Sequence, residues 1–429
     1  MLDNIFKSIT KIFKFSNNSL KTAIKFVLGN FLAAIITGIS TIFIAKYVDS
    51  ETLGSFNKYA ILTSYLTLSI FLVDAAFQRH FTYYIGKKNI VKAMEIASSA
   101  KWWFLFSSIL GSIIFIILTV NSLFSNDYHS IVGWLTQLSL YWVLNYVVYL
   151  KVLYRTNDDF NKLNKNLIIT SISGFLSLPF IYLFDFLGLA LRSTIQNIFN
   201  ILTHITNVPF KVKAKFNVII FKDLVKTSIP IQLPVYLDSN LMQASILLLI
   251  LDKLGESALG IYSVAISFQA IVMLFSQSIN QILTTKLMLN FGDTDNFKKT
   301  SRYSFKLMIP TLIVSFFIVI FFNLLLDPLM QYLPKYIESV PILRLLSVEA
   351  IFLVLRLPIN VFFASLMIKT MALLRISKVI IILVGIYLFN DSLLSIVTVV
   401  MLGNLINILM GYILLYINFK NKSSEVIIN

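Results

Sequence analysis

The sequence predicts an all-α integral membrane protein whose twelve transmembrane helices form two six-helix bundles, related by a pseudo-two-fold axis along the membrane normal. Three observations predict this fold class: the composition, the length of the apolar segments, and a motif that recurs half a chain apart. Of the 429 residues, 57% are hydrophobic and 13% are charged, whereas a soluble chain carries about 25% charged residues. Because the apolar excess extends along the whole chain, lipid is the expected solvent for most of it.

The composition also excludes several kinds of site. The chain has no cysteine, so a disulfide framework, a thiol nucleophile and a thiolate metal site are excluded. The three histidines, His80, His129 and His204, are scattered along the chain. We therefore expect no metal centre and no cofactor other than a coupling ion, either a proton or sodium. The first apolar run, about residues 24–48, is too long for a signal-peptide core, so we expect it to remain as a membrane span.

Twelve mostly apolar segments reach the length of about 20 residues that a membrane-spanning helix needs. An even number of spans places both termini on the same side of the membrane. The fifth and sixth spans touch at the sequence LFDFLGLALR. The predicted spans are 24–47, 58–78, 102–124, 131–153, 167–185, 187–208, 229–251, 259–285, 305–326, 341–366, 374–390 and 395–418.

The distribution of positive charge supports this topology. With a cytoplasmic amino terminus, most of the 36 Lys and Arg residues fall in the inner segments, as cytoplasmic loops require. The net charge of +16 is then explained by orientation and by anionic lipid of the inner leaflet, and no nucleic-acid partner is expected. The few basic residues assigned to the outer connections are Lys46, Lys58, Arg192, Lys253 and Lys335.

The same patterns divide the chain into five parts. In residues 1–20, apolar side chains at helical spacing lie opposite lysines, which predicts an amphipathic helix lying in the membrane interface. Residues 21–210 are the predicted N-terminal bundle, 211–228 a basic cytoplasmic linker, and 229–419 the C-terminal bundle. Residues 420–429 are the predicted cytoplasmic tail.

A short motif occurs once in each predicted bundle. The stretch AKYVDSETLGSFNKYA begins at Ala45, and LDKLGESALGIYSVA begins at Leu251; each places Leu-Gly, one variable residue and an aromatic after a charged turn. Both follow the first span of a six-span half, so the halves enter the membrane with the same orientation, as in the parallel repeats of transporters. We interpret Gly54 and Gly260 as residues that permit a tight turn with positive φ.

Hinges are predicted at the first span of each half. The first span contains Gly29 and Gly38, and the seventh contains Pro230 and Pro234. Interrupted segments in corresponding positions of two halves indicate a transport site near them. The alternative is that these residues are simply more frequent in membrane helices than in soluble ones.

Four stretches carry a family resemblance: AKYVDSETLGSFNKY, LGESALGIYSVA, LYRTNDDFNKLNKN and LPKYIESVPILRLLSV. With them the chain resembles the polysaccharide transporter family, the Wzx-type flippases of O-antigen and capsular repeat units. This family shares the MOP superfamily with MATE multidrug exporters and lipid II flippases. The resemblance implies a MATE-like fold in the bacterial inner membrane. It also implies a flippase that moves an undecaprenyl-diphosphate-linked oligosaccharide to the outer leaflet, alongside membrane lipid and other polysaccharide assembly proteins.

The chain departs from the family pattern at three places. Family members often carry an aspartate where this chain has Gln243-Ala244-Ser245, a proline where it has Thr284-Thr285, and a glycine where it has Val73-Asp74. For this reason only the fold and the class of substrate are carried over, and no residue's role.

Charged residues inside the membrane are functional candidates, because each costs at least about 2.5–3.5 kcal/mol to place there. We predict that Arg356 and Arg344 bind the substrate diphosphate, since guanidinium groups match phosphate oxygens. We assign Asp238, Glu349 and Asp74 to the coupling ion. On a straight helix Glu349 and Arg356 would be about 10 Å apart, too far for a direct pair. The alternative is a structural network of ion pairs that holds helices together, or, for Arg344, a plain anchor at the membrane interface.

Polar residues at helical spacing predict the lining of a cavity. A stripe facing lipid would leave amides without hydrogen-bond partners, so these faces should turn inward. Hydrogen bonds between helices explain the same pattern without a cavity. The predicted lining residues are Asn30 and Thr37 on the first span, Asn197, Asn200 and His204 on the sixth, and Gln269 and Asn280 on the eighth.

Other function classes fit less well. An enzyme such as a polysaccharide polymerase or ligase needs a large external loop for its active site. Here the longest outer connection, Asp327 to Val340, is short and holds no paired carboxylates or histidine cluster. We therefore expect no enzymatic activity. A MATE-type multidrug or cation antiporter is the main alternative, and export of another envelope lipid is a further one.

Overall fold

The computed structural model describes residues 17–206, 208–294, 296–365 and 367–424. These ranges consist of helices and their connections and contain no strand. The predicted interfacial helix lies almost wholly outside the described residues. The first described helix begins at Asn17, and the last one runs to Ser424, so the first residues of the predicted tail continue a helix.

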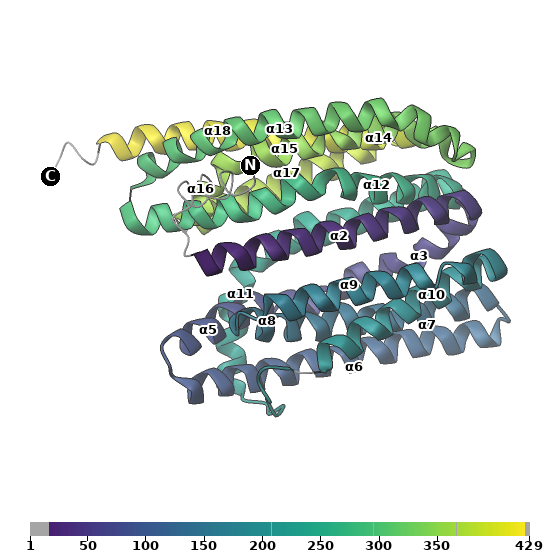
Figure 1. The fold of residues 1–429 in the computed structure, drawn as a ribbon, viewed down its shortest axis with the longest axis horizontal. Helices are drawn as coiled ribbons and strands as arrows, with labels where there is room; N and C mark the ends of the chain where they lie inside the picture. The colour runs from purple at the N-terminus through teal and green to yellow at the C-terminus, as the bar shows by residue number, and fades with distance from the viewer. Residues whose placement is uncertain (1–16, 207, 295, 366, 425–429) are drawn as a thin grey trace.

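The helices run side by side along the long axis of the molecule and form two lobes (Figure 1). We call the helices before residue 206 the N-lobe and those after residue 217 the C-lobe. The N-lobe contains α2 (Asn17–Tyr47), α3 (Ser50–Leu66), α4 (Leu68–Phe71), α5 (Asp74–Gly86), α6 (Ile90–Phe124), α7 (Tyr128–Trp142), α8 (Val148–Thr156), α9 (Phe160–Leu176) and α10 (Pro179–Ile205), with the π-helix η1 (Val143–Val147) between α7 and α8.

The C-lobe is more often interrupted than the N-lobe. Prolines at residues 230, 234, 334, 341 and 358 lie at or beside several of the interruptions, because proline lacks the N–H that continues a helix. The C-lobe contains α11 (Val218–Tyr236), η2 (Leu237–Leu241), α12 (Met242–Thr294), α13 (Phe297–Gln331), η3 (Pro334–Ser339), α14 (Val340–Ser347), α15 (Glu349–Leu355), η4 (Leu357–Asn360), α16 (Val361–Ala364), α17 (Ile368–Leu388) and α18 (Leu393–Ser424).

The described chain crosses the membrane twelve times. Eight helical stretches are long and apolar enough to do so, and the bent pair α9 and α10 joins them. One of the eight, Val218–Asn280, turns back at Gly255, where φ is +84°, and therefore makes two passes. The bent pair also makes two, and the interrupted run from α14 to α16 makes one. Large apolar side chains cover the outer surface of these helices, for example Leu324 at 71% exposure.

The turn between the fifth and sixth passes differs from the prediction. Helix α9 ends at Leu176, and the chain bends by 98° before α10. Inside α10 it bends again at Asp185, where φ is +47°. The predicted break near residue 186 is therefore present, but a short helical corner precedes it. A Cβ on Gly188 would overlap the carbonyl oxygen of Phe180, so only glycine lets this corner fold so tightly.

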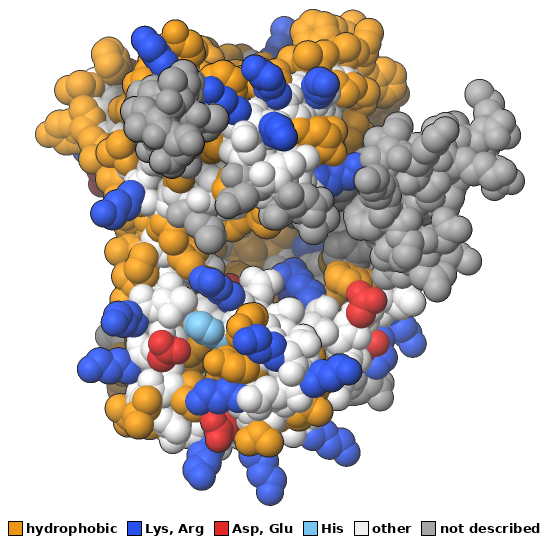
Figure 2. All heavy atoms as spheres, turned by 90° about the vertical axis from the view of Figure 1, so that its left-hand side faces the viewer, with side chains coloured by type: hydrophobic (Ala, Val, Ile, Leu, Met, Phe, Trp, Pro, Cys, Tyr) orange, Lys and Arg blue, Asp and Glu red, His pale blue; other side chains and the backbone are white. Residues whose placement is uncertain are grey.

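The lobes meet closely at one end of the molecule, where α3 lies against α12. We call this the paired-glycine end, because Gly54 and Gly260 form the contact. Across it, Ser50 Oγ and Ser257 Oγ lie 2.8 Å apart, and Lys58 Nζ lies 2.7 Å from Glu256 Oε1. The opposite end carries many lysines and arginines, and its surface is hollowed between the lobes (Figure 2). We call it the basic end.

Candidate functional site

Three cavities lie between the lobes and share lining residues, and together we call them the interlobe cleft. One of about 650 Å³ lies between α2, α9 and α12. Another of about 590 Å³ lies between α5, α11 and α17. The third, of about 890 Å³, lies between α5 and α8 of the N-lobe and Met288 of α12 in the C-lobe. Arg155 lines the first and third, and Arg79 lines the second and third, so these two side chains stand where the cavities adjoin.

The charged residues that line the cleft are all basic. Arg79 and Arg155 come from the N-lobe, Arg375 comes from the C-lobe, and Lys87 directly follows α5. Within the described part of the chain, Arg79 and Arg155 are exposed and form no hydrogen bond or ion pair. A guanidinium without a partner retains its full set of five N–H donors for an anionic ligand. The cleft is therefore suited to bind an anion.

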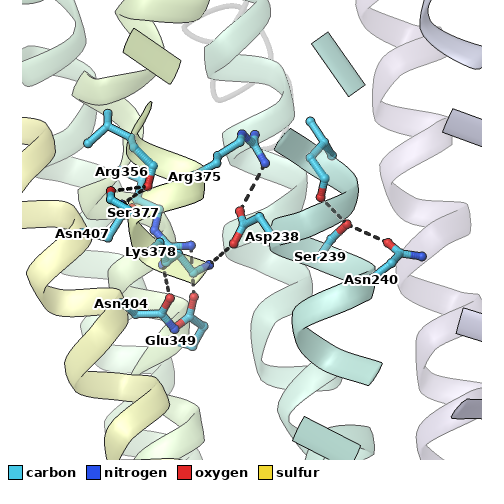
Figure 3. A network of polar contacts seen from close by, with 12 residues as sticks. Asp238, Ser239, Asn240, Glu349, Arg356, Arg375, Ser377, Lys378, Asn404 and Asn407 are labelled. Carbon is cyan, nitrogen blue, oxygen red and sulfur yellow. Dashed lines mark hydrogen bonds and ion pairs between the residues drawn. The ribbon is translucent and has the colours of Figure 1, made fainter. Parts of the chain in front are cut away.

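Behind the wall of the cleft lies a group of five charged side chains, which we call the C-lobe charge cluster: Asp238, Glu349, Arg356, Arg375 and Lys378 (Figure 3). Asp238 lies between two cations. Its Oδ2 is 3.2 Å from Arg375 Nη1, and its Oδ1 is 2.6 Å from Lys378 Nζ. Arg375 also lines the cleft, so the cluster is in contact with the cavity through this residue.

Local sequence places Asp238 in this position. Pro230 and Pro234 remove two N–H donors from α11. The helix then widens into the π-helical turn η2, which contains Asp238. Single π turns inside α-helices occur often at functional sites. Arg375 and Lys378 lie three residues apart on α17 and so share a face that meets this turn.

The second half of the cluster is a closed triangle of contacts. Arg356 Nη1 lies 3.2 Å from Glu349 Oε1, Asn404 Nδ2 donates to Glu349 Oε2 at 2.8 Å, and Arg356 Nη2 donates to Asn404 Oδ1 at 2.8 Å. Glu349 and Arg356 would be too far apart to pair on a straight helix, but the helix is broken between them and they do pair. Helix α15 ends at Leu355 and η4 follows with Pro358. Arg356 lies at this break, from which its long side chain reaches back to Glu349.

The other predicted charged residues lie elsewhere. Arg344, at the end of α14, forms an exposed pair in which its Nη2 contacts both carboxylate oxygens of Asp327, at 2.7 and 2.8 Å. The structure thus does not bring Arg344 together with Arg356. Arg344 is instead paired with the exposed Asp327. Asp74 begins α5 in the N-lobe, where the charge of Arg155 acts on it. It is not part of the C-lobe charge cluster.

Of the predicted cavity residues, Asn30 and Thr37 line the cleft. The other five lie within a lobe, because their polar groups face neighbouring helices of the same bundle. For Asn197, Gln269 and Asn280 this is the alternative of hydrogen bonds between helices, whereas His204 and Asn200 contact each other within α10. Asn197 donates to Ser139 Oγ, His204 Nδ1 contacts the Asn200 carbonyl, Gln269 donates to the Leu346 carbonyl, and Asn280 accepts from Asn360.

Sequence reasoning missed several residues of the site. Arg375 and Lys378 were counted among the inner basic charges, although both lie within the predicted eleventh span, 374–390. The helix begins at Ile368, so both lie inside it. Two basic residues three apart in an apolar helix would have been the signal. Arg79 and Arg155 were likewise counted only as inner charges, and Asn404 in the apolar α18 was overlooked.

The structure is that of a multi-pass membrane protein in which two lobes of helices flank a polar cleft that opens at one end. Residues 56–309 match the sequence profile of a family described as polysaccharide biosynthesis protein. This match spans more than half of the chain, and the chain belongs to this family. No curated protein matches the sequence.

Solved structures share the fold. An inward-facing multidrug resistance MATE transporter of the MOP superfamily superposes with a TM-score of 0.69 at 13% identity, over 91% of this chain and 96% of that one. An outward-facing MATE transporter gives 0.64 at 14% identity, over 94% and 96%. A MOP superfamily transporter from Pyrococcus furiosus, described by the reversed polarity of its binding pocket, gives 0.61 at 14% identity, over 93% and 96%. At these identities the likeness shows the fold alone.

Proposed function

We propose that this transporter flips undecaprenyl-diphosphate-linked oligosaccharide repeat units, of O-antigen or capsular type, from the cytoplasmic to the outer leaflet of the bacterial inner membrane. Membership of the polysaccharide biosynthesis family supports a glycan substrate. The observation that carries the proposal is that Arg79 and Arg155, in a cleft open at the basic end, form no hydrogen bond or ion pair with any described residue. By the positive-inside rule this end is cytoplasmic.

The chemistry of the cleft suits the three parts of such a substrate. The arginines match the diphosphate, because guanidinium binds phosphate oxygens in pairs. Asn30, Thr37 and Gln277 offer hydrogen-bond partners to sugar hydroxyls. The cavity beside α11 also has apolar walls, to which Phe362 and Met371 contribute. An isoprenoid chain can leave along such walls toward the lipid.

Charge separates this function from cation export. Among the described residues, no carboxylate lines any of the three cavities. The charged groups that a cationic drug would meet there are therefore all basic. The diphosphate site is accordingly placed on Arg79 and Arg155, with Arg375 on the facing wall. Arg356 is already bound to Glu349 and Asn404, and we now assign it a structural role.

Transport by alternating access follows from the arrangement of the lobes. The cleft is closed at the paired-glycine end and open at the basic end, which is the state that receives substrate from the cytoplasm. Separation of α3 from α12 would open the other side. We further propose that a proton or sodium gradient drives the return of the empty carrier.

Reconstitution in liposomes tests the proposal. A fluorescent lipid-diphosphate oligosaccharide is placed in the inner leaflet, and its arrival outside is followed with a membrane-impermeant lectin. We expect the double variant R79Q/R155Q to slow flipping at least tenfold. The matched control is K222Q, because Lys222 is an exposed basic residue that lines none of the three cavities. Equal rates in the parent and the double variant, or faster uptake of a cationic dye than of the glycolipid, would overturn it.

A further inference from the structure

The C-lobe charge cluster holds more positive than negative groups. Three cations, Arg356, Arg375 and Lys378, face two carboxylates, Asp238 and Glu349. The two halves act on each other, because Arg356 influences both Arg375 and Lys378 through its charge. An unbalanced charge away from water is costly. Loss of one proton would therefore remove the surplus charge and stabilise the cluster.

Only one of the three cations is able to give up a proton. Arginine stays protonated in proteins, which excludes Arg356 and Arg375. Each carboxylate already contacts a guanidinium, Glu349 that of Arg356 and Asp238 that of Arg375, both at 3.2 Å. Lys378, with a side chain only 8% exposed, is left as the group whose charge can change. Protonating a carboxylate instead would raise the surplus charge further.

We infer that Lys378 is the proton-exchanging residue that couples this transporter to its ion gradient, with Asp238 relaying the proton to the cleft. The inference rests on the proposed function for what is transported, and deepens it by naming the driving ion. The groups that face Lys378 are Asp238 from η2, Glu349 and Arg356 from α15 and its end, Asn404 and Asn407 from α18, and Arg375 from its own helix.

The proton has a defined route. The Lys378 ammonium gives a proton to Asp238 Oδ1, which lies 2.6 Å away, and becomes a neutral amine. The protonated Asp238 then passes the proton to water in the cleft, which forms hydronium, and the carboxylate is restored. The net charge of the cluster falls from +1 to zero. Asp238, with a side chain 16% exposed, lies next to Arg375, which lines the cavity.

The same geometry argues against sodium. A sodium ion would add positive charge to a cluster that already has a surplus, and both carboxylates are occupied by protein cations. Among the described residues there is also no grouping of three or more acidic, histidine or cysteine side chains that could hold a metal ion. Transport should therefore not need sodium.

An anion in the cleft should favour the protonated state. Arg375 uses one contact to Asp238, at 3.2 Å, and retains other donors toward the cavity. A diphosphate bound there adds negative charge beside the cluster and stabilises the extra proton on Lys378. By linkage, protonation of Lys378 then strengthens binding of the anion by the same factor.

Difference titration tests the proton site independently of transport. Purified protein and the variant K378R are titrated between about pH 6 and pH 9, a range in which an exposed lysine, with a pKa of about 10.4, stays charged. We expect the parent to release about one proton per chain more than K378R. The matched control K222R, at an exposed lysine, should titrate like the parent. K378M removes the same proton, and it replaces K378R if the latter does not fold.

Three results decide the matter. Equal titration of the parent and the Lys378 variant would overturn the inference. A difference of one proton, together with flipping of the lipid-diphosphate oligosaccharide that depends on a pH gradient and not on sodium, supports both proposals. A difference of one proton without flipping of that lipid leaves the proton site in place and refutes the proposed substrate.

Discussion

Gly54 and Gly260 pack against each other's helices in a reciprocal contact. A Cβ on Gly54 would overlap the carbonyl oxygen of Glu256, and a Cβ on Gly260 would overlap that of Ser50. Ser50 and Glu256 are related by the same repeat that relates the two glycines. The two copies of the motif are therefore the two sides of one contact, with the self-complementarity of a two-fold interface.

This contact corrects the role predicted for the glycines. Both lie within helices, α3 and α12, and neither has positive φ. Their missing side chains let two backbones approach, as small residues do in membrane helix pairs. The conformation predicted for them belongs to Gly255, which lies five residues before Gly260 in the second stretch and has φ of +84°.

Substitution of Gly260 by alanine should open the paired-glycine end. The added Cβ meets backbone, which cannot move aside as a flexible side chain would. The measurement is the yield of a disulfide between cysteines introduced as S50C and S257C, whose native Oγ atoms lie 2.8 Å apart in this cysteine-free chain. We expect G260A to lower the yield severalfold. G86A is the control, because a Cβ there meets nothing within 4 Å, and its yield should equal the parent's.

The same disulfide should stop transport. With S50C and S257C oxidised, α3 and α12 stay joined and the cleft opens only at the basic end. We expect flipping in proteoliposomes to fall to background and to recover after reduction. Each single-cysteine variant, treated with the same oxidant, should keep its activity. Undiminished flipping by the crosslinked protein would show that the paired-glycine end does not separate during transport.

Breaking the pair between Glu349 and Arg356 should destabilise the protein strongly. Their side chains are 11% and 22% exposed, and removal of one partner from a buried pair costs about 3–5 kcal/mol. We expect R356M to lower the midpoint of thermal unfolding in detergent, and E349Q/R356M to recover part of the loss. R344Q is the comparison: it breaks the exposed pair with Asp327, which should cost only about 0–1 kcal/mol. Equal losses from R356M and R344Q would contradict the structural role of Arg356.

Asp49 should make stability depend on pH at the start of α3. Burial acts to raise the pKa of its carboxyl, but hydrogen bonds from the backbone and side chain of Thr52 outweigh this and lower the pKa. A lowered pKa stabilises the folded state above the unfolded value of about 3.9, and the effect disappears as the pH falls through the folded value.

The variant D49A removes the acceptor at this helix start, which costs about 1 kcal/mol at neutral pH. Thermal unfolding of D49A and the parent should therefore differ at pH 7 and converge below about pH 4. D49N retains an acceptor, so its stability should fall between the two at pH 7. A difference that stays constant from pH 7 to pH 3.5 would refute a contribution from the ionised carboxylate.

Several features of the fold could be predicted from the sequence because they depend on local composition. The membrane segments are recognisable by length and apolar content alone, as α6 and α13 show. The repeat was visible in the sequence because Gly54 and Gly260 occupy equivalent places in the contact between α3 and α12. Each must lack a side chain for the two backbones to approach. The break beside Asp185 appeared as an interruption of the apolar run. The run from α14 to α16 was predicted as one span, which it is, but its interruptions were missed. Hydropathy does not register a change from α-helix to 3₁₀-helix.

The site could be predicted only in part, because a polar residue in a membrane helix can face either a cavity or a neighbouring helix. Asn30 and His204 show the same signal, a polar group at helical spacing in an apolar run. Yet Asn30 lines the cleft and His204 is buried inside the N-lobe. Which of the two occurs depends on how the helix is rotated relative to the neighbouring helices.

The sequence by itself determined that this chain lies in a membrane, how often it crosses, that its halves are related, and that its interior contains charged residues. These properties follow from hydropathy and from the cost of charge in lipid, which act on each segment separately. The tertiary structure decided which charges pair: Asp238 with Lys378 and Arg375, and Glu349 with Arg356, whereas Arg79 and Arg155 form no ion pair with any described residue. Pairing depends on distances between segments far apart in the chain, and helix packing sets those distances.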